Sequence, residues 1–282
     1  MPAPDILTIS REPEDRSTET ARRLVVTWQH PGKRLIEPVG LLEYDGQCYR
    51  FGYIRHALSV EGFRPLLGFR DLYAPYASDE LFPLFAQRVM DPRRPDYRRY
   101  VGRLGLDEDA TPWEQIARSQ GSRQGDTIQL LPEPRNEDGV ITGRFLVHGV
   151  RHVPGPSRVL DGRAMQVDSE QVEAALAALR PGEPLGIASE PGNEVNCLAL
   201  MVMAQRVTPV GWIPNLLLED MHRLMVVTDV SVAAEHINGA DAPWHLRLLA
   251  RLTARGAGDF KFFADEKWEL LSAPDQYANT SG

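Results

Sequence analysis

The seven histidines are, by type, the side chains best suited to bind a metal or to act as a general base. Most are scattered, and the two closest, His148 and His152, stand four residues apart. Residues 141–153 alternate as a strand, in which that spacing separates two side chains on one face by about 13 Å. Two ligands of one metal cannot lie so far apart. We interpret the histidines as surface or core residues and expect no metal site.

The sequence lacks the common motifs of nucleotide and hydrolytic chemistry. It contains neither GxxxxGK[ST] nor GxGxxG for phosphate binding, and neither HExxH nor GxSxG for hydrolysis. The acids of residues 107–109 are typical of the entry to a helix, where carboxylates favour the positive N-terminus. We therefore expect no cofactor and no catalytic residue, and interpret the chain as a non-enzymatic protein.

A dense group of arginines lies within residues 93–103. On a helix that begins near Asp96, Arg99 and Arg103 lie on one face, and Arg98 is next to them. These guanidinium groups could hold phosphates, or they could equally pair with the carboxylates of residues 107–109. The sequence leaves both alternatives open and favours a solvated face, so the group is a candidate second basic patch.

Composition limits the classes of partner and compartment. The chain has 282 residues and a net charge of −8, so a nucleic-acid site must be a local patch rather than a broad basic surface. No apolar run reaches the roughly 18–20 residues that span a bilayer, so we expect no membrane contact. Residues 1–22 have no signal-peptide pattern and are expected to be a flexible leader. Cys48 and Cys197 then read as reduced thiols of a cytoplasmic protein.

The first part of the chain alternates strand and helix signals. Asp45-Gly46 predicts a hairpin that would pair Tyr44 with Tyr49. A helix is expected after Ser78 as N-cap, and a second short helix over 91–106. A third carries a capping box between Thr111 and Glu114 and ends near Gly121. A strand over 126–134 returns, and the polar residues 135–139 make the best boundary.

The second part predicts a small, strongly curved barrel plugged by helices. Its clearest helix begins at Asp168, with Gln171 completing a capping box. Two strands, 183–189 and 196–204, flank a polar turn, and a helix capped by Asn215 follows a short strand. Residues 140–230 would form the barrel, with 231–282 as a C-terminal extension packing on it. The expected fold class is α+β: a hairpin sheet with helices, then a small OB/SH3-like β-barrel.

An ordered set of short motifs over about 145–225 resembles the HIRAN domain. The pieces are a Gly-hydrophobic-Arg-aromatic strand, a Pro-Gly turn, a strand ending in Glu-Pro, an Asn-containing turn, a strand with small and apolar residues, and a Gly-aromatic-Ile-Pro strand before a helix. In this sequence they are Gly149-Val150-Arg151-His152, Pro181-Gly182, Glu190-Pro191, Gly192-Asn193, Leu198-Ala199-Leu200 and Gly211-Trp212-Ile213-Pro214.

The resemblance implies a barrel that binds single-stranded DNA or a free 3′ end of DNA. By position, Arg151 would hold a phosphate, His152 would take the stacking position beside it, and Trp212 would offer a further base platform. Such barrels grip phosphate with arginine and stack bases on aromatic rings. The remaining residues expected to bind nucleic acid are Asn193, Asn196 and Asn215.

The sequence departs from the family pattern in two places. The turn commonly carries an aromatic residue and an acid where this chain has Val195 and Asn196, and the segment after Pro214 holds Glu219 and Asp220 where basic residues are common. These departures favour an alternative, in which a degenerate HIRAN barrel serves a protein-interaction or antitoxin-like regulatory scaffold.

Residues of about 23–134 resemble the N-terminal subdomain of HipA-type toxin kinases. A hairpin sheet is followed by helices and by an ending in which Gly121, Asp126, Leu130 and Pro132 match the pattern. The kinase body is missing, so the resemblance implies regulatory contacts without kinase activity. It implies a protein partner bound through this N-terminal module.

Overall fold

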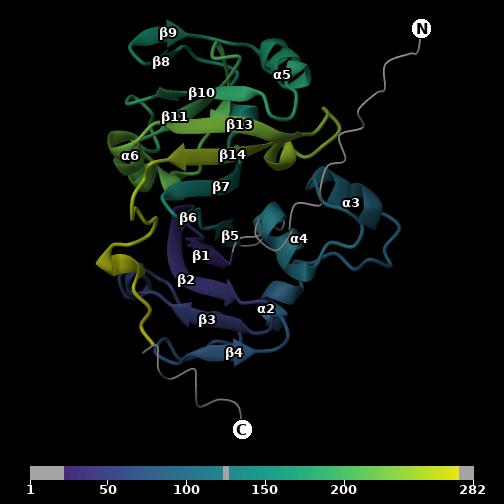
Figure 1. Ribbon diagram of the computed structural model, residues 1–282, viewed down its shortest axis with the longest axis vertical. Helices are drawn as coiled ribbons and strands as arrows, with labels where there is room; N and C mark the ends of the chain where they lie inside the picture. The colour runs from purple at the N-terminus through teal and green to yellow at the C-terminus, as the bar shows by residue number, and fades with distance from the viewer. Residues whose placement is uncertain (1–21, 123–126, 273–282) are drawn as a thin grey trace, which may run out of the picture.

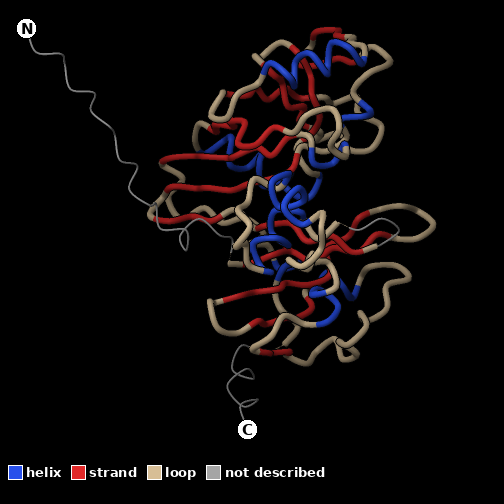
Figure 2. The backbone as a smooth tube through the Cα atoms, turned by 90° about the vertical axis from the view of Figure 1, so that its right-hand side faces the viewer, coloured by secondary structure: helices blue, strands red, loops and turns tan. Residues whose placement is uncertain are grey.

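The computed structural model describes residues 22–122 and 127–272, which form two antiparallel sheets joined by helices and loops (Figure 1). The fold class is α+β, as predicted from the sequence. Figure 2 shows the strands gathered in two groups, one above the other, with helical turns between them. Within the described residues, no helix is both long enough and apolar enough to cross a membrane.

The first sheet has five strands in the order β4-β3-β2-β1-β5. The predicted hairpin at Asp45-Gly46 is confirmed, because Tyr44 lies opposite Tyr49 in the register and their rings stack at 4.2 Å. The strands are β1 (Arg23–Gln29), β2 (Ile36–Tyr44), β3 (Tyr49–Tyr53), β4 (Tyr76–Ser78) and β5 (Ile128–Pro132).

Short helices cover this sheet. The capping box of Thr111 and Glu114 is confirmed at α4 (Pro112–Ser119). The helix expected after Ser78 is wrong in extent: Ser78 ends β4, and α2 spans only Pro83–Ala86. Proline fits the first turn of a helix and keeps the residue before it extended, so Pro83 sets the start. The others are η1 (Arg55–Leu58) and α3 (Tyr97–Arg103).

The second sheet has seven strands in the order β12-β11-β10-β13-β14-β7-β6. The chain enters it directly after residues 133–134. Its strands are β6 (Arg135–Glu137), β7 (Val140–Leu146), β10 (Pro184–Ser189), β11 (Leu200–Ala204), β12 (Thr208–Trp212), β13 (Val230–Ile237) and β14 (Leu248–Arg255), and a separate hairpin pairs β8 (Arg158–Leu160) with β9 (Arg163–Met165).

The sheet curls until β12 meets the chain that continues β7. His148 and Trp212 form an antiparallel bridge, in which each backbone N–H donates to the other carbonyl at 2.9 Å. Glycine is required here: a Cβ on Gly149 would lie 2.6 Å from the Trp212 ring, and one on Gly211 would lie 2.4 Å from Val147. The glycines of two resemblance motifs therefore close the small barrel.

The single strand expected over 141–153 is wrong. β7 ends at Leu146, and Val150–His152 forms the 3₁₀ helix η2. Gly149 has φ +68°, a left-handed conformation that turns the chain out of the strand. His148 and His152 thus do not share a strand face. No group of three or more potential metal ligands occurs in the part of the chain that the structure describes.

Helices pack against the strands of the second sheet. The capping box of Asp168 and Gln171 begins α5 (Ser169–Ala178), as predicted. Asn215 is not a side-chain cap: a 3₁₀ turn begins there and the α-helix starts later, without a side-chain cap hydrogen bond. The remaining elements are η3 (Asn215–Leu217), α6 (Leu218–Val227), η4 (Trp244–Leu246) and η5 (Glu266–Trp268).

The C-terminal region, residues 231–272 as described, is not only the predicted extension packed on the barrel but also supplies strands of its sheet. β13 and β14 lie inside the second sheet, between β10 and β7. The following residues return to the first sheet, where the Leu271 N–H donates to the Tyr53 carbonyl at 2.8 Å. Val25 of the first sheet, Phe145 of the second and Trp268 belong to one buried cluster, so the two sheets share a core.

Candidate nucleic-acid interface

The barrel-side residues expected to bind nucleic acid lie on three segments: η2, the turn over 190–198, and the residues that end and follow β12. Backbone pairing of His148 with Trp212 brings η2 to the end of β12. The turn begins where β10 ends and leads into β11, the neighbour of β12. The barrel closure therefore assembles residues that are up to 64 positions apart in the sequence, from Arg151 to Asn215.

Arg151 and His152 are both exposed and contact each other. Arg151 Nε donates to His152 Nε2 at 3.0 Å, so that imidazole nitrogen acts as an acceptor. Nearby His148 is different: burial lowers its pKa to about 4, so it is neutral and adds no positive charge. The positive charge of η2 thus comes from Arg151, with an aromatic ring next to it.

Trp212 is half-buried and held on two sides. Its indole Nε1 donates to Glu190 Oε2 at 2.7 Å. The guanidinium carbon of Arg158 lies 5.3 Å from the ring centroid, a cation–π contact. Trp212 also packs against the buried clusters of the barrel. One side of the ring is therefore occupied, and its one N–H is already bonded.

The asparagines of the turn bond mainly to the turn itself. Asn193 Nδ2 donates to Glu190 at 2.7 Å, and its Oδ1 accepts from the Val195 and Asn196 N–H groups at 3.0 and 3.2 Å. Asn196 Oδ1 accepts from the Leu198 N–H at 2.9 Å. These bonds fix the loop and leave Val195 exposed at its tip. Asn215 is exposed at the start of η3.

Two residues of this interface were missed from the sequence. Glu190 is only 5% exposed and pairs with Arg158, whose Nε lies 3.2 Å from Glu190 Oε1. Glu190 was noted only as part of a Glu-Pro motif. Its position next to Pro191, at the end of an apolar strand, is the only sequence signal that could have drawn attention to it. Arg158 carries no such signal.

The acids after Pro214 are engaged within the protein. Glu219 pairs with Lys267 at 2.5 Å. Asp220 is buried, accepts from the Phe263 N–H at 2.8 Å, and pairs with Arg223 at 2.7 Å. Burial raises the pKa of Asp220. This acidic stretch anchors the C-terminal segment, and its carboxylates are not free charges beside η2.

The candidate second patch on α3 is largely neutralised by acids. Arg98 Nε pairs with Glu108 at 2.5 Å, and Arg103 pairs with Asp241 at 2.6 Å. Of the two alternatives left open, pairing with residues 107–109 holds for Arg98. Arg103 ties α3 to the loop before η4, and Arg99 is exposed. In Figure 1, α3 lies well away from the β8–β9 hairpin that follows η2.

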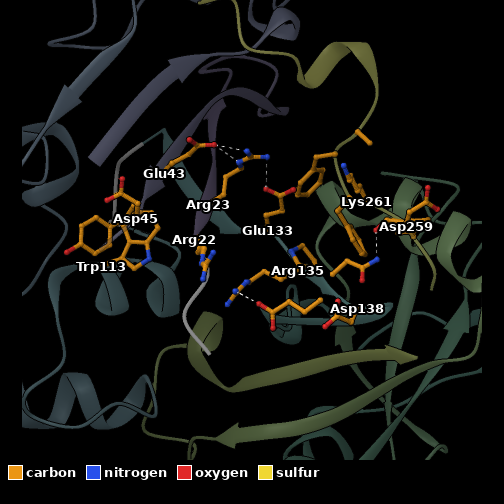
Figure 3. Close-up of a pocket in the computed structure, with 18 of the residues that line it drawn as sticks. Arg22, Arg23, Glu43, Asp45, Trp113, Glu133, Arg135, Asp138, Asp259 and Lys261 are labelled. Carbon is orange, nitrogen blue, oxygen red and sulfur yellow. Dashed lines mark hydrogen bonds and ion pairs between the residues drawn. The ribbon is translucent and has the colours of Figure 1, made fainter. Parts of the chain in front are cut away.

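A cleft of about 1450 Å³ lies between the two sheets (Figure 3). At its centre Arg23 pairs with Glu43 at 2.7 Å and with Glu133 at 3.3 Å. Burial raises the pKa of Glu133 to about 7, against the opposing charge of Arg23. The cleft mixes both signs of charge. It was not anticipated from the sequence, because residues far apart in the chain line it.

No family model and no curated protein matches the chain. Among solved structures, the HIRAN domain of human HLTF matches at 14% identity and a TM-score of 0.28, covering 42% of this chain and 81% of that domain. A Lactobacillus plantarum protein matches at 18% identity and a TM-score of 0.30, covering 41% of this chain and 97% of that protein.

These likenesses cover less than half of the chain at low identity, and they do not tell what it binds. The resemblance of residues 23–134 to the HipA-type subdomain has no counterpart among the reported matches and stays a prediction. One residue of that pattern, Asp126, lies outside the described residues.

Proposed function

We propose that this chain is a non-enzymatic binding protein that holds single-stranded DNA, or a free DNA end, on the surface formed by η2 and the turn over 190–198. One observation carries the proposal: Arg151 and His152 are exposed side by side at the point where the barrel closes. A guanidinium group next to an aromatic ring suits a nucleotide, because the cation attracts the phosphate while the ring stacks on the base.

This binding mode should depend little on the base sequence of the DNA. Base reading requires free donors and acceptors directed at base edges. The side-chain oxygens of Asn193 and Asn196 are already bonded to the turn, which leaves little capacity to read bases. We expect affinity to depend on phosphate contact and stacking, and therefore to fall with salt. The HIRAN resemblance adds the preference for a 3′ end, and the sequence pattern of two separate cysteines adds a cytoplasmic setting.

Fluorescence anisotropy with a 5′-labelled single strand that ends in a 3′-OH tests the proposal. The Arg151→Ala variant should bind more weakly than wild type at every salt concentration, and the slope of log K against log salt should shrink by about 1 as one phosphate contact is lost. Arg70→Ala removes an exposed arginine from the first half and serves as the control. Equal binding by wild type and Arg151→Ala would overturn this site.

The alternative function is protein binding through the N-terminal module. Exposed apolar side chains favour it: Leu35 and Ile36 lie at the β1–β2 turn, and Leu58 lies on η1, which packs on β2. Titration with a purified HipA-type kinase, followed by calorimetry, tests this alternative. Binding that is lost in a Leu58→Glu variant, with no binding of single strands, would favour the scaffold over the DNA-binding protein.

A further inference from the structure

We propose that Glu190 is the positioning residue of the candidate interface, and this inference rests on the proposed function. Its carboxylate is buried and is bound by one side chain from each of three segments. The Trp212 indole N–H and the Asn193 amide each donate to Oε2 at 2.7 Å, and Arg158 Nε forms an ion pair with Oε1 at 3.2 Å. One side chain thus holds the end of β12, the turn over 190–198 and the start of β8 in a fixed relation.

Arg158 extends this control to the residues that would contact DNA. Its terminal nitrogens donate to the His152 carbonyl at 2.8 Å, the Val153 carbonyl at 3.1 Å and the Pro156 carbonyl at 3.2 Å. The guanidinium also lies over the Trp212 ring. Glu190 therefore fixes Arg158, and Arg158 fixes the backbone that carries Arg151 and His152.

The negative charge of Glu190 is essential to this arrangement. Arg158 is half-buried, and a guanidinium that is partly removed from water is stabilised by an acidic partner and by hydrogen bonds. An ionised carboxylate only accepts hydrogen bonds, so Glu190 can accept from Trp212 and Asn193 while it pairs with Arg158. A glutamine would lose the charge, and its amide would direct an N–H toward one of these partners. A shorter aspartate would not reach all three segments. The site is built for a glutamate.

The roles of the predicted site residues change accordingly. Trp212 and Asn193 use their N–H groups to bind Glu190. Together with Glu190 and Arg158 they form what we call the frame of the interface. Direct contact with DNA is left to Arg151 and His152, whose side chains are exposed. We infer that the frame sets the distance between the phosphate held by Arg151 and the base stacked on His152.

Anisotropy with the same labelled strand distinguishes the positioning role of Glu190 from the phosphate contact of Arg151. Glu190→Gln should weaken binding by about tenfold, which equals the loss of one hydrogen bond to a charged group. The salt slope should stay at the wild-type value, because no phosphate contact is removed. Glu170→Gln, an exposed acid at the start of α5 and outside the proposed surface, is the control and should leave affinity unchanged.

A double-mutant cycle separates positioning from general stability. If Glu190 acts by placing His152, Glu190→Gln should have no further effect on binding in a His152→Ala background. A tenfold loss in both backgrounds would show a merely structural role and overturn the inference. Arg158→Lys keeps the charge but loses the planar donors, so it should reduce the affinity as much as Glu190→Gln does. It tests the same contact independently if the Glu190→Gln variant folds poorly.

The two proposals fail in different ways. Wild-type affinity in both Glu190→Gln and Arg158→Lys, together with weakened binding in Arg151→Ala, overturns the positioning role and keeps the DNA site. Unchanged binding in Arg151→Ala overturns the DNA site itself, and the positioning inference with it.

Discussion

Two arginine-bearing regions of this protein differ in how their charge is balanced. On α3 the sequence places several arginines close together, yet Arg98 and Arg103 pair with Glu108 and Asp241. On η2 a single arginine, Arg151, donates to a histidine, and no acid pairs with it within the described residues. A dense group of basic residues in a sequence therefore does not by itself indicate unpaired positive charge in the fold. Whether an arginine keeps an unpaired charge depends on the carboxylates that the fold brings next to it.

The largest expected effect comes from breaking the turn that presents η2. Gly149→Ala should destabilise the protein by about 2–5 kcal/mol, the sum of a left-handed penalty and overpacking against Trp212. Urea denaturation measures the free energy of unfolding. Gly102→Ala on α3 is the control: nothing lies within 4 Å of its added Cβ, and an alanine in a helix should stabilise by about 0.5–1 kcal/mol. Equal stabilities for the two variants would contradict the barrel closure.

The sequence predicted those parts of the fold that depend on local patterns. The hairpin at Asp45-Gly46 and the capping boxes at Thr111 and Asp168 need only neighbouring residues to form, and the structure contains all three. The strand over 141–153 failed because a single glycine, Gly149, turns the chain through a conformation that periodicity does not reveal.

The frame of the candidate site could not be predicted from the sequence, for a different reason. Glu190 meets Arg158 from 32 positions away and Trp212 from 22. Such partners are set by how β10, β12 and the β8–β9 hairpin pack, and no local spacing encodes them. Arg151, His152 and Trp212 were predicted from an ordered set of short motifs that resembles a known family. The pairings that hold them came only from the structure.

Two buried carboxylates extend the comparison of charge balance to pH. Burial raises the pKa of Glu133 to about 7, with Arg23 as its cationic partner. Burial acts on Glu235 in the same direction, but Arg144 and Arg118, with Arg251 adding a hydrogen bond, hold its pKa at about 2. The number of guanidinium groups around a buried acid therefore decides the direction of the shift.

These opposite shifts give opposite pH dependences of stability. Glu133 binds its proton more tightly in the folded state, so its contribution is complete below pH 4.5 and is lost as pH rises through about 7, by about 1–3 kcal/mol. Glu235 contributes above pH 4.5, and that contribution is lost as pH falls toward 2. Thermal unfolding of Glu133→Gln should lose the decline between pH 5 and 8. A decline of equal size in this variant would refute the assignment to Glu133.

The smallest expected effect tests whether α3 can be converted into an anion site. Glu108→Gln removes the acid that pairs with exposed Arg98, leaving Arg98 and Arg99 without it. Stability should change by less than about 1 kcal/mol, because exposed ion pairs contribute little. Binding of single strands at low salt should become stronger, and the salt slope should increase by about 1 as one more phosphate contact forms. An unchanged slope would mean that position on the barrel, and not freedom from an acidic partner, distinguishes Arg151 from the arginines of α3.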